Sequence, residues 1–478
     1  MSKQQMLNFV EVSSEMPQKR TKGERLGDFE EIYSDYPPET AAVQASRCSQ
    51  CGVPYCQTHC PLHNNIPDWL KLSAEGRLKE AYFLSQETNT FPEICGRICP
   101  QDRLCEGNCV IEQAGHGTVT IGSIEKYLTD LAWEKGWVEA INPPIEHDFS
   151  VGIIGAGPAG LAAADALRRN GTKVVIYDQH DRPGGLLTYG IPGFKLEKPV
   201  VMKRIDQLVD GGVDFRMNCR VGRDISFQEI RQKYDSVLVA TGVYKSRDIK
   251  CPGIGLDGIV QAIDYLTASN RKSFGDKVPD FDSGILNAHG KRIVVIGGGD
   301  TAMDCVRTAV RQGAKSVRCY YRRDKENMPG SRREVQNAEE EGVEFIWLTS
   351  PKGFSGKDIV TKVLARKMRL SDRDATGRRT PVPIPGGDFD EKADLVIKAL
   401  GFEPENLPLD WKVPELQITG WGTLKTNFRT HETNLPGIYA GGDIVRGASL
   451  VVWAIRDGRE AAETILKQFR NTLLDRAA

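Results

Sequence analysis

Eight of the twelve cysteines in this 478-residue chain lie between residues 48 and 109. They form two runs with the spacings C-x2-C-x4-C-x3-C-P and C-x3-C-P-x4-C-x3-C. Only Cys48 and Cys51 have the paired spacing that is typical of structural zinc sites. The first run is closer to that of bacterial two-cluster ferredoxins, whose last cysteine binds the other cluster. We therefore favour two iron–sulfur clusters over zinc.

The cross-over pattern of those ferredoxins predicts how the cysteines divide. The first cluster is predicted to bind Cys48, Cys51, Cys56 and Cys109. Three corners of the second are predicted to be Cys60, Cys99 and Cys105. Its fourth ligand stays open between Cys95 and an oxygen donor, for which Glu125 is the candidate. The other four cysteines are isolated and predicted to be apolar filler: Cys219, Cys251, Cys305 and Cys319.

A G-x-G-x-x-G loop starts at Gly155, between the predicted strand 151–154 and the predicted helix 161–170. The first glycine makes the tight turn, the second lets a pyrophosphate approach, and the third lets helix and strand pack closely. Asp178 stands 23 residues later, where an acidic residue binds ribose hydroxyls. An ordinary glycine turn is the alternative, but the context favours FAD. The predicted contacts are Gly155, Gly157, Pro158, Ala159, Gly160 and Asp178.

Two distant segments are predicted to complete this first site. Gly185 and Leu186 belong to a stretch whose adjacent glycines allow backbone to approach a flat ligand. Gly442 and Asp443 follow a predicted strand, and the carboxylate can bind a ribityl hydroxyl. A second Gly-rich loop separates these two segments, so one sheet domain is predicted to be inserted into another.

This second loop, beginning at Gly297, has Ala302 in place of the third glycine. The position 23 residues after Gly297 is a tyrosine, and Arg322 and Arg323 follow at once. Guanidinium groups bind a 2′-phosphate that an acidic residue would repel. The pattern favours NADPH over NADH, although a solvated strand end is the alternative. The predicted contacts are Gly297, Gly299, Asp300, Thr301, Arg322 and Arg323.

Alternating apolar strands and helices after residue 148 predict an α/β fold with two doubly wound, Rossmann-like domains of the glutathione reductase type behind an N-terminal all-α iron–sulfur domain. The expected domains are 1–147 for the clusters, 148–285 and 402–478 for FAD, and 286–401 for NADPH. Residues 1–45 are expected to be an extended arm with little core, and 354–392 to form hairpins. Strands are expected at 151–154, 173–177, 236–240, 292–296, 317–321 and 394–399, and helices at 121–137, 161–170 and 449–460.

Charge is balanced, with 63 basic and 64 acidic residues, which argues against nucleic acid or an anionic membrane as the main partner. The first 20 residues lack the apolar segment of a signal peptide, and no apolar run approaches the roughly 20 residues needed to span a bilayer. We expect a cytoplasmic protein, in which disulfides are rare.

The chain resembles the small (beta) subunits of bacterial NADPH-dependent glutamate synthases over nearly its full length. The resemblance rests on the following stretches: 48–60, 95–100, 155–160, 185–192, 297–304, 321–323, 441–443 and 453–459. Relatives with the same module include the N-terminal half of dihydropyrimidine dehydrogenase and the large subunit of NADH-dependent ferredoxin:NADP oxidoreductases. In these relatives Gln or Glu completes one cluster, and the matching residue here is Glu125. The resemblance therefore favours Glu125 over Cys95.

The resemblance implies ammonia assimilation: NADPH reduces FAD, and two [4Fe-4S] clusters pass single electrons to a large (alpha) subunit that makes L-glutamate from L-glutamine and 2-oxoglutarate. Hydride transfer between these cofactors needs no protein base, so no catalytic residue is predicted. One alternative is the large subunit of a bifurcating NADPH:ferredoxin oxidoreductase. Another is a scaffold with vestigial cofactor sites, against which the intact Gly, Asp and Arg sets argue.

Overall fold

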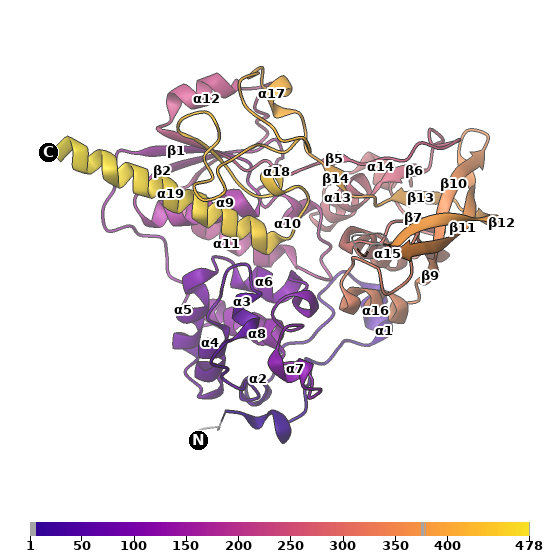
Figure 1. Ribbon diagram of the computed structural model, residues 1–478, viewed down its shortest axis with the longest axis horizontal. Coiled ribbons are helices and arrows are strands. Elements are labelled where there is room, and N and C mark those ends of the chain that lie inside the picture. Colours follow the sequence, from indigo (N-terminus) through magenta and orange to yellow (C-terminus); the bar gives the residue numbers. More distant parts are fainter. Residues whose placement is uncertain (1–5, 374–376, 378, 478) are drawn as a thin grey trace.

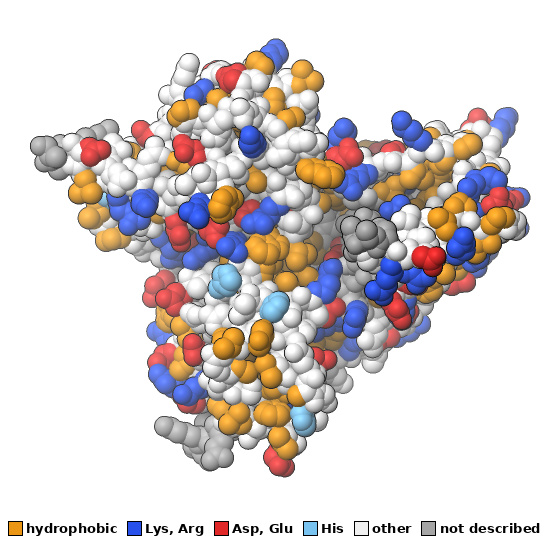
Figure 2. Space-filling model, in the orientation of Figure 1, with side chains coloured by type: hydrophobic (Ala, Val, Ile, Leu, Met, Phe, Trp, Pro, Cys, Tyr) orange, Lys and Arg blue, Asp and Glu red, His pale blue; other side chains and the backbone are white. Residues whose placement is uncertain are grey.

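The computed structural model describes residues 6–373, 377 and 379–477. A helical N-terminal part lies beside two sheet-containing parts, and the long C-terminal helix α19 (Val451–Ala477) crosses the first of them (Figure 1). Acidic and basic side chains are intermixed on the face seen in Figure 2. In the described part of the chain, helices with the length and apolar character of a membrane span are lacking.

Packed short helices form the N-terminal part, and their shared core includes Trp69, Tyr82, Ile124 and Leu128, all of which are fully buried. The predicted helix over 121–137 ends earlier, at Glu134, because Gly136 with φ 66° ends the turn. The helices are α1 (Lys22–Gly27), α2 (Pro38–Ala45), α3 (Tyr55–Thr58), α4 (Ile66–Ala74), α5 (Leu78–Thr88), α6 (Pro92–Ile98), α7 (Val110–Gln113) and α8 (Ile121–Glu134).

The expectation of an extended arm is wrong for its described residues; residues 1–5 lie outside them. Thr21 and Glu24 form a reciprocal capping box that starts α1. Pro38 does not break the chain but stands in the first turn of α2, where its missing N–H costs nothing. Arg25 and Tyr36 are both buried, so the arm contributes to the core instead of lying over it.

Two five-stranded parallel sheets carry the two Gly-rich loops, and the predicted fold class is confirmed. In both sheets the Gly-rich loop follows the central strand, but one edge strand is the last of its sheet along the chain in the first sheet and the first of its sheet in the second. The first sheet has the order β15 (Ile438–Ala440), β4 (Ser236–Val239), β1 (Ser150–Ile154), β2 (Lys173–Tyr177), β3 (Asp214–Arg216). The second has the order β6 (Ile259–Gln261), β13 (Leu395–Lys398), β7 (Arg292–Ile296), β8 (Ser316–Tyr321), β9 (Glu344–Trp347).

The second sheet begins earlier in the chain than the expected boundary at residue 286. Edge strand β6 pairs in parallel with β13, although it lies in the range expected for the first sheet domain. It is only three residues long, too short for the hydrophobic pattern to distinguish it from a loop. The helices of the two sheet parts are α9 (Pro158–Arg169), α10 (Leu186–Tyr189), α11 (Lys198–Asp210), α12 (Phe227–Lys233), α13 (Ala262–Ser273), α14 (Pro279–Asp282), α15 (Asp300–Arg311), α16 (Arg332–Glu341), α17 (Leu407–Asp410) and α18 (Asp443–Arg446).

The hairpins expected over 354–392 are present as a three-stranded antiparallel sheet, β10 (Thr349–Gly356), β11 (Val360–Arg373) and β12 (Arg379–Lys392). Residues 374–376 and 378 of this segment lie outside the described residues. A short antiparallel pair, β5 (Lys245–Ser246) and β14 (Phe402–Glu403), lies where the chain passes between the two large sheets.

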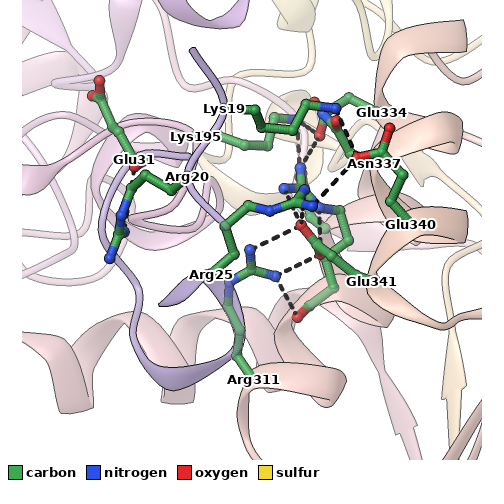
Figure 3. Close-up of polar contacts among 12 residues, drawn as sticks. Lys19, Arg20, Arg25, Glu31, Lys195, Arg311, Glu334, Asn337, Glu340 and Glu341 are labelled. Atoms are coloured by element: carbon green, nitrogen blue, oxygen red, sulfur yellow. Dashed lines mark hydrogen bonds and ion pairs between the residues drawn. The ribbon is translucent and has the colours of Figure 1, made fainter. Parts of the chain in front are cut away.

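A buried charge network joins the arm to the second sheet domain (Figure 3). Arg25 of α1 pairs with Glu341 at 3.4 Å and with Glu340 at 3.3 Å, and both acids are on α16. Arg307 and Arg311 of α15 bind the same fully buried Glu341 at 2.9 and 2.7 Å. Three arginines from α1 and α15 thus share the buried Glu341 carboxylate of α16 in one desolvated cluster of opposite charges.

The other end of α16 is held by the loop between two of the predicted cluster ligands. Asp102 accepts hydrogen bonds from the Ser331 hydroxyl and the Arg332 backbone N–H, both at 3.0 Å. Arg103 pairs with Asp300 at 3.1 Å, at the start of α15. Both ends of α16 are therefore fixed by residues from the first 103 positions of the chain.

Glu334 gives this network a defined pH dependence. Burial raises the pKa of its carboxyl, but Arg307 and Lys195 outweigh burial and bring the pKa down to about 2 from 4.5. A carboxyl whose pKa falls on folding stabilises the protein above its unfolded pKa, and this stabilisation is lost as pH falls from about 4.5 towards 2. We expect Glu334→Gln to flatten the loss of stability in that window, by roughly 3 kcal/mol over the full range. Denaturant midpoints at a series of pH values measure it, and parallel curves for both proteins would contradict it.

Candidate functional site

The eight clustered cysteines line two separate small cavities. Cys48, Cys51, Cys56 and Cys109 surround one of about 20 Å³ between α3, α4 and α7. Cys60, Cys99 and Cys105, together with Cys95 and Glu125, surround another of about 30 Å³. The structure thus brings together each predicted ligand set and separates the two sets.

The local backbone helps to position the thiols of the first cavity, and burial raises the pKa of thiols in both cavities. Gln50, in a left-handed conformation with φ 51°, turns the chain between Cys48 and Cys51, and its amide donates to the Cys48 Sγ at 3.3 Å. Burial raises the pKa of Cys48 to about 11 and those of Cys56 and Cys60 to about 12. Such thiols stay protonated at neutral pH unless a cation compensates the thiolate, which is what an iron–sulfur cluster supplies.

The spacing of the sulfur atoms argues against zinc. In a tetrahedral site with Zn–S bonds of about 2.3 Å, the sulfur atoms lie about 3.8 Å apart. Within the described residues, no cysteine belongs to a group of three or more ligand atoms that all lie within 4.8 Å of one another. A polynuclear cluster holds its cysteines farther apart, since iron and sulfide fill the space between them. The residues present therefore fit iron–sulfur clusters better than zinc ions.

Cys95 and Glu125 both reach the second cavity, and Asn89 contacts each of them. The Asn89 side-chain amide donates to Glu125 Oε1 at 3.1 Å, and the Cys95 thiol lies 3.8 Å from Asn89 Oδ1. Burial raises the pKa of Glu125 to about 8. The geometry alone allows either residue to be the fourth ligand.

We expect Cys95→Ser to retain about eight irons per FAD and Glu125→Ala to lose iron from one cluster. The reason is the family resemblance, in which Gln or Glu completes one cluster, because Asn89 contacts both candidates and does not distinguish them. Iron and sulfide analysis of anaerobically purified variants measures the difference. Iron loss in Cys95→Ser with none in Glu125→Ala would reverse the assignment.

All of the predicted flavin contacts except Gly160 and Gly185 line one cavity, which is bounded by both halves of the first sheet domain. A Cβ at Gly155, whose φ is 113°, would lie 2.3 Å from the Ala240 carbonyl oxygen, so only glycine fits. A Cβ at Gly157 would meet no protein atom, which leaves the space that a pyrophosphate needs at the start of α9. The other predicted residues on this cavity are Pro158, Ala159, Asp178, Leu186, Gly442 and Asp443. Gly160 packs against the loop, since a Cβ there would lie 2.0 Å from the Gly155 oxygen.

The two predicted acids at this cavity are both held by hydrogen bonds. Asp178 accepts from the Ala156 N–H and from the His180 N–H, each at 2.8 Å. Asp443 accepts from the Ser449 hydroxyl at 2.6 Å, and burial raises its pKa. These contacts fix both carboxylates at the rim of the cavity.

Sequence reasoning missed two residues of this site, Asp457 and Tyr244. Asp457 accepts from the Gly442 N–H at 3.0 Å and pairs with Arg446 at 2.6 Å, and so holds the turn before Asp443. Tyr244 lines the same cavity. Asp457 stands in the AIRDGR stretch that carried part of the family resemblance, which was the only available signal.

The second Gly-rich loop repeats the geometry of the first. A Cβ at Gly297 would lie 2.2 Å from the Ala399 carbonyl oxygen, and one at Gly299 would meet no protein atom. Asp300 and Thr301 follow at the start of α15. Arg322 and Arg323 come directly after β8. Asp178 occupies the equivalent position in the first sheet, directly after β2. The Arg323 Nε is buried and, among the described residues, lacks a hydrogen-bond partner.

A larger cavity of about 210 Å³ lies where the three parts meet. Its walls include Cys99 from the helical part, Thr301 from the second sheet domain and Leu450 from the first. Leu450 and Val451 also line the flavin cavity, and Val452 also lines the second cysteine cavity. The start of α19 is thus a wall shared by all three cavities.

Comparisons with known proteins agree with this arrangement. Residues 25–137 match the family model "dihydropyrimidine dehydrogenase domain II, 4Fe-4S cluster", and residues 149–458 match "pyridine nucleotide-disulphide oxidoreductase". The chain is 64% identical to the glutamate synthase (NADPH) small chain of Azospirillum brasilense, over 97% of this chain and 96% of the relative. It is 45% identical to the corresponding small chain of Escherichia coli, over 97% and 98%. FprA of Mycobacterium tuberculosis, solved with NADPH, shares the fold with a TM-score of 0.58 and 20% identity, over 69% of this chain and 86% of FprA.

Proposed function

Because the chain belongs to the family of NADPH-dependent glutamate synthase small chains, we propose that it is the electron-input subunit of a glutamate synthase. Its cofactors in this proposal are FAD, NADPH and two [4Fe-4S] clusters. The proposed partner is a large (alpha) subunit, which makes L-glutamate from L-glutamine and 2-oxoglutarate. The proposed location is the cytoplasm, where reduced thiols persist.

The observation that carries the proposal is the shared wall at the start of α19. Leu450, Val451 and Val452 all line the cavity of about 210 Å³ where the three parts meet. Each of them also lines either the flavin cavity or the second cysteine cavity. When bound, FAD accepts a hydride from NADPH and the clusters carry single electrons. The role of these three apolar side chains is to keep the sites adjacent and to exclude water between them.

The remaining residues bind and orient. The N-termini of α9 and α15, behind Gly157 and Gly299, offer backbone N–H groups to the two pyrophosphates. Asp178 and Asp443 would accept hydrogen bonds from the sugar and ribityl hydroxyls of FAD, and Arg322 with Arg323 would bind the 2′-phosphate of NADPH. No side chain is assigned as a proton donor or acceptor in the reaction.

We propose that residues 1–147 hold the clusters and that the two sheet domains hold FAD and NADPH. The proposed ligands of the first cluster are Cys48, Cys51, Cys56 and Cys109. Those of the second are Cys60, Cys99, Cys105 and Glu125. The division into two cavities and the wide spacing of the sulfur atoms support this count of two.

Anaerobic purification tests the proposal directly. We expect about eight irons and eight sulfides for each FAD, no FMN, and loss of flavin absorbance when NADPH is added. In a pull-down experiment with this chain as bait, we expect capture of a partner of glutaminase size. Capture of a small [2Fe-2S] flavoprotein would favour the bifurcating oxidoreductase instead. Zinc in place of iron, or a flavin that stays oxidised with NADPH in the absence of air, would overturn the proposal.

A further inference from the structure

Arg47 is fully buried, yet its hydrogen bonds go only to uncharged backbone oxygens. Its Nε donates to the Val12 oxygen at 2.9 Å, and its terminal nitrogens donate to the oxygens of His116, at 2.8 Å, of Gly117, at 3.0 Å, and of Thr118. Within the described chain, no carboxylate lies within the 4 Å of its guanidinium that defines an ion pair. The side chain therefore satisfies its hydrogen bonds without neutralising its charge.

Burying an uncompensated charge is expensive, so a retained arginine in this position calls for a counter-anion. The other buried arginines of the chain show the usual solution, since Arg25, Arg204, Arg307 and Arg311 all pair with carboxylates. Arg47 is the residue directly before Cys48, so we look for the missing negative charge at the cavity that Cys48 lines.

Two observations connect Arg47 to the first cysteine cavity. It directly precedes Cys48, and the 116–118 loop that it holds leads into Val119, which lines the same cavity as Cys48 and Cys109. Arg47 therefore ties together the segments that carry both ends of the proposed ligand set. A cluster with four thiolate ligands carries net negative charge and supplies the anion that the protein lacks.

We propose that Arg47 is the counter-charge of the first cluster and sets its reduction potential. This inference rests on the proposed ligand set Cys48, Cys51, Cys56 and Cys109. The reduced cluster carries one more negative charge than the oxidised cluster, so a fixed positive charge beside it favours reduction. Arg47 thereby makes the first cluster a better electron acceptor than the same cluster would be without this charge. Arg47 is a tuning and positioning residue and takes no part in hydride transfer.

Redox titration of the full chain, followed by electron paramagnetic resonance, measures the effect. Arg47→Gln should shift the midpoint potential of one cluster to a more negative value and leave the other unchanged. Arg47→Lys keeps the charge and should stay close to the wild-type value. The signal that shifts should be the one that disappears in Cys109→Ser. Arg25→Gln, a buried arginine with carboxylate partners, is the matched control and should shift neither signal.

Ser14→Asp provides a second variant in case Arg47→Gln loses the cluster. Ser14 is exposed and donates to the same Thr118 oxygen that Arg47 binds, so a carboxylate there neutralises the guanidinium without removing its hydrogen bonds. We expect a shift in the same direction as for Arg47→Gln. Unchanged potentials in Ser14→Asp, or an equal shift in Arg47→Lys and Arg47→Gln, would overturn the inference. Absence of cluster signals from the wild-type protein would instead overturn the proposed function.

Discussion

Replacing both Arg322 and Arg323 with alanine is expected to raise the KM for NADPH by about 100-fold, since charge-assisted bonds to a phosphate are among the strongest polar contacts in proteins. NADH lacks the 2′-phosphate, so its KM should hardly change. Arg322 and Arg323 follow β8 where Asp178 follows β2, and the Arg323 Nε is buried without a partner among the described residues. Steady-state rates with an artificial electron acceptor, measured with each nucleotide, give both constants.

Lys325→Ala is the matched control for this variant. Lys325 is an exposed basic residue of the same loop and pairs with Glu339 at 2.7 Å, so its loss should leave both KM values near those of the wild type. The kcat at saturating NADPH should also be retained by the double variant, because the arginines bind a part of the nucleotide remote from the reacting ring. Equal increases in both KM values would show that the two arginines do not read the 2′-phosphate.

Glu93→Gln should destabilise the protein by roughly 3–5 kcal/mol, the usual cost of leaving one partner of a buried ion pair uncompensated. Glu93 on α6 is fully buried and binds the buried Arg204 of α11 through two contacts of 2.9 Å. Arg204 also lies over the rings of Trp133 and Phe91, at 5.1 and 5.8 Å from their centroids. This pair joins the cluster part to the first sheet domain, so its loss should weaken their contact. Denaturant unfolding followed by flavin release and circular dichroism measures the change.

Glu80→Gln offers the appropriate comparison. Glu80 also pairs with an arginine, Arg77, but both side chains are exposed, so water screens the pair and its loss should have little effect. Replacing Glu93 and Arg204 together with apolar residues of similar volume should recover much of the stability, because no buried charge then stays unpaired. A Glu93→Gln protein as stable as Glu80→Gln would contradict this account of the interface.

The parts of the site that could be predicted from the sequence are those whose chemistry is local. Gly155 and Gly297 are required because an adjacent strand end leaves no room for a Cβ. A short motif of consecutive residues is enough to recognise this constraint in the sequence. The cysteine ligands could be predicted for a similar reason. Most of the cysteines around each cavity lie close together in the chain. The doubly wound class of both sheets followed from the alternation of apolar strands and helices along the chain.

The contacts that could not be predicted depend on partners far apart in the chain. Arg25 and Glu341 are 316 positions apart, and the local sequence around either residue does not indicate the other as its partner. Asp457 supports the flavin turn through a backbone N–H 15 residues earlier, a role that any acid on that helix could have had. The arm was misjudged for the same reason, since the burial of Arg25 depends on partners on α15 and α16 that lie far along the chain.

The attachment of α16 at both ends also has a consequence for biosynthesis. Lys19 and Glu340 are 321 positions apart, yet they bind each other at 2.7 Å. At a translation rate of about 5–20 residues per second, the arm waits roughly 16–64 seconds after it is made before its acceptor exists. During that interval the basic side chains of the arm lack these carboxylate partners. The oldest segment of the polypeptide therefore reaches its final contacts only after one of the younger helices has been made.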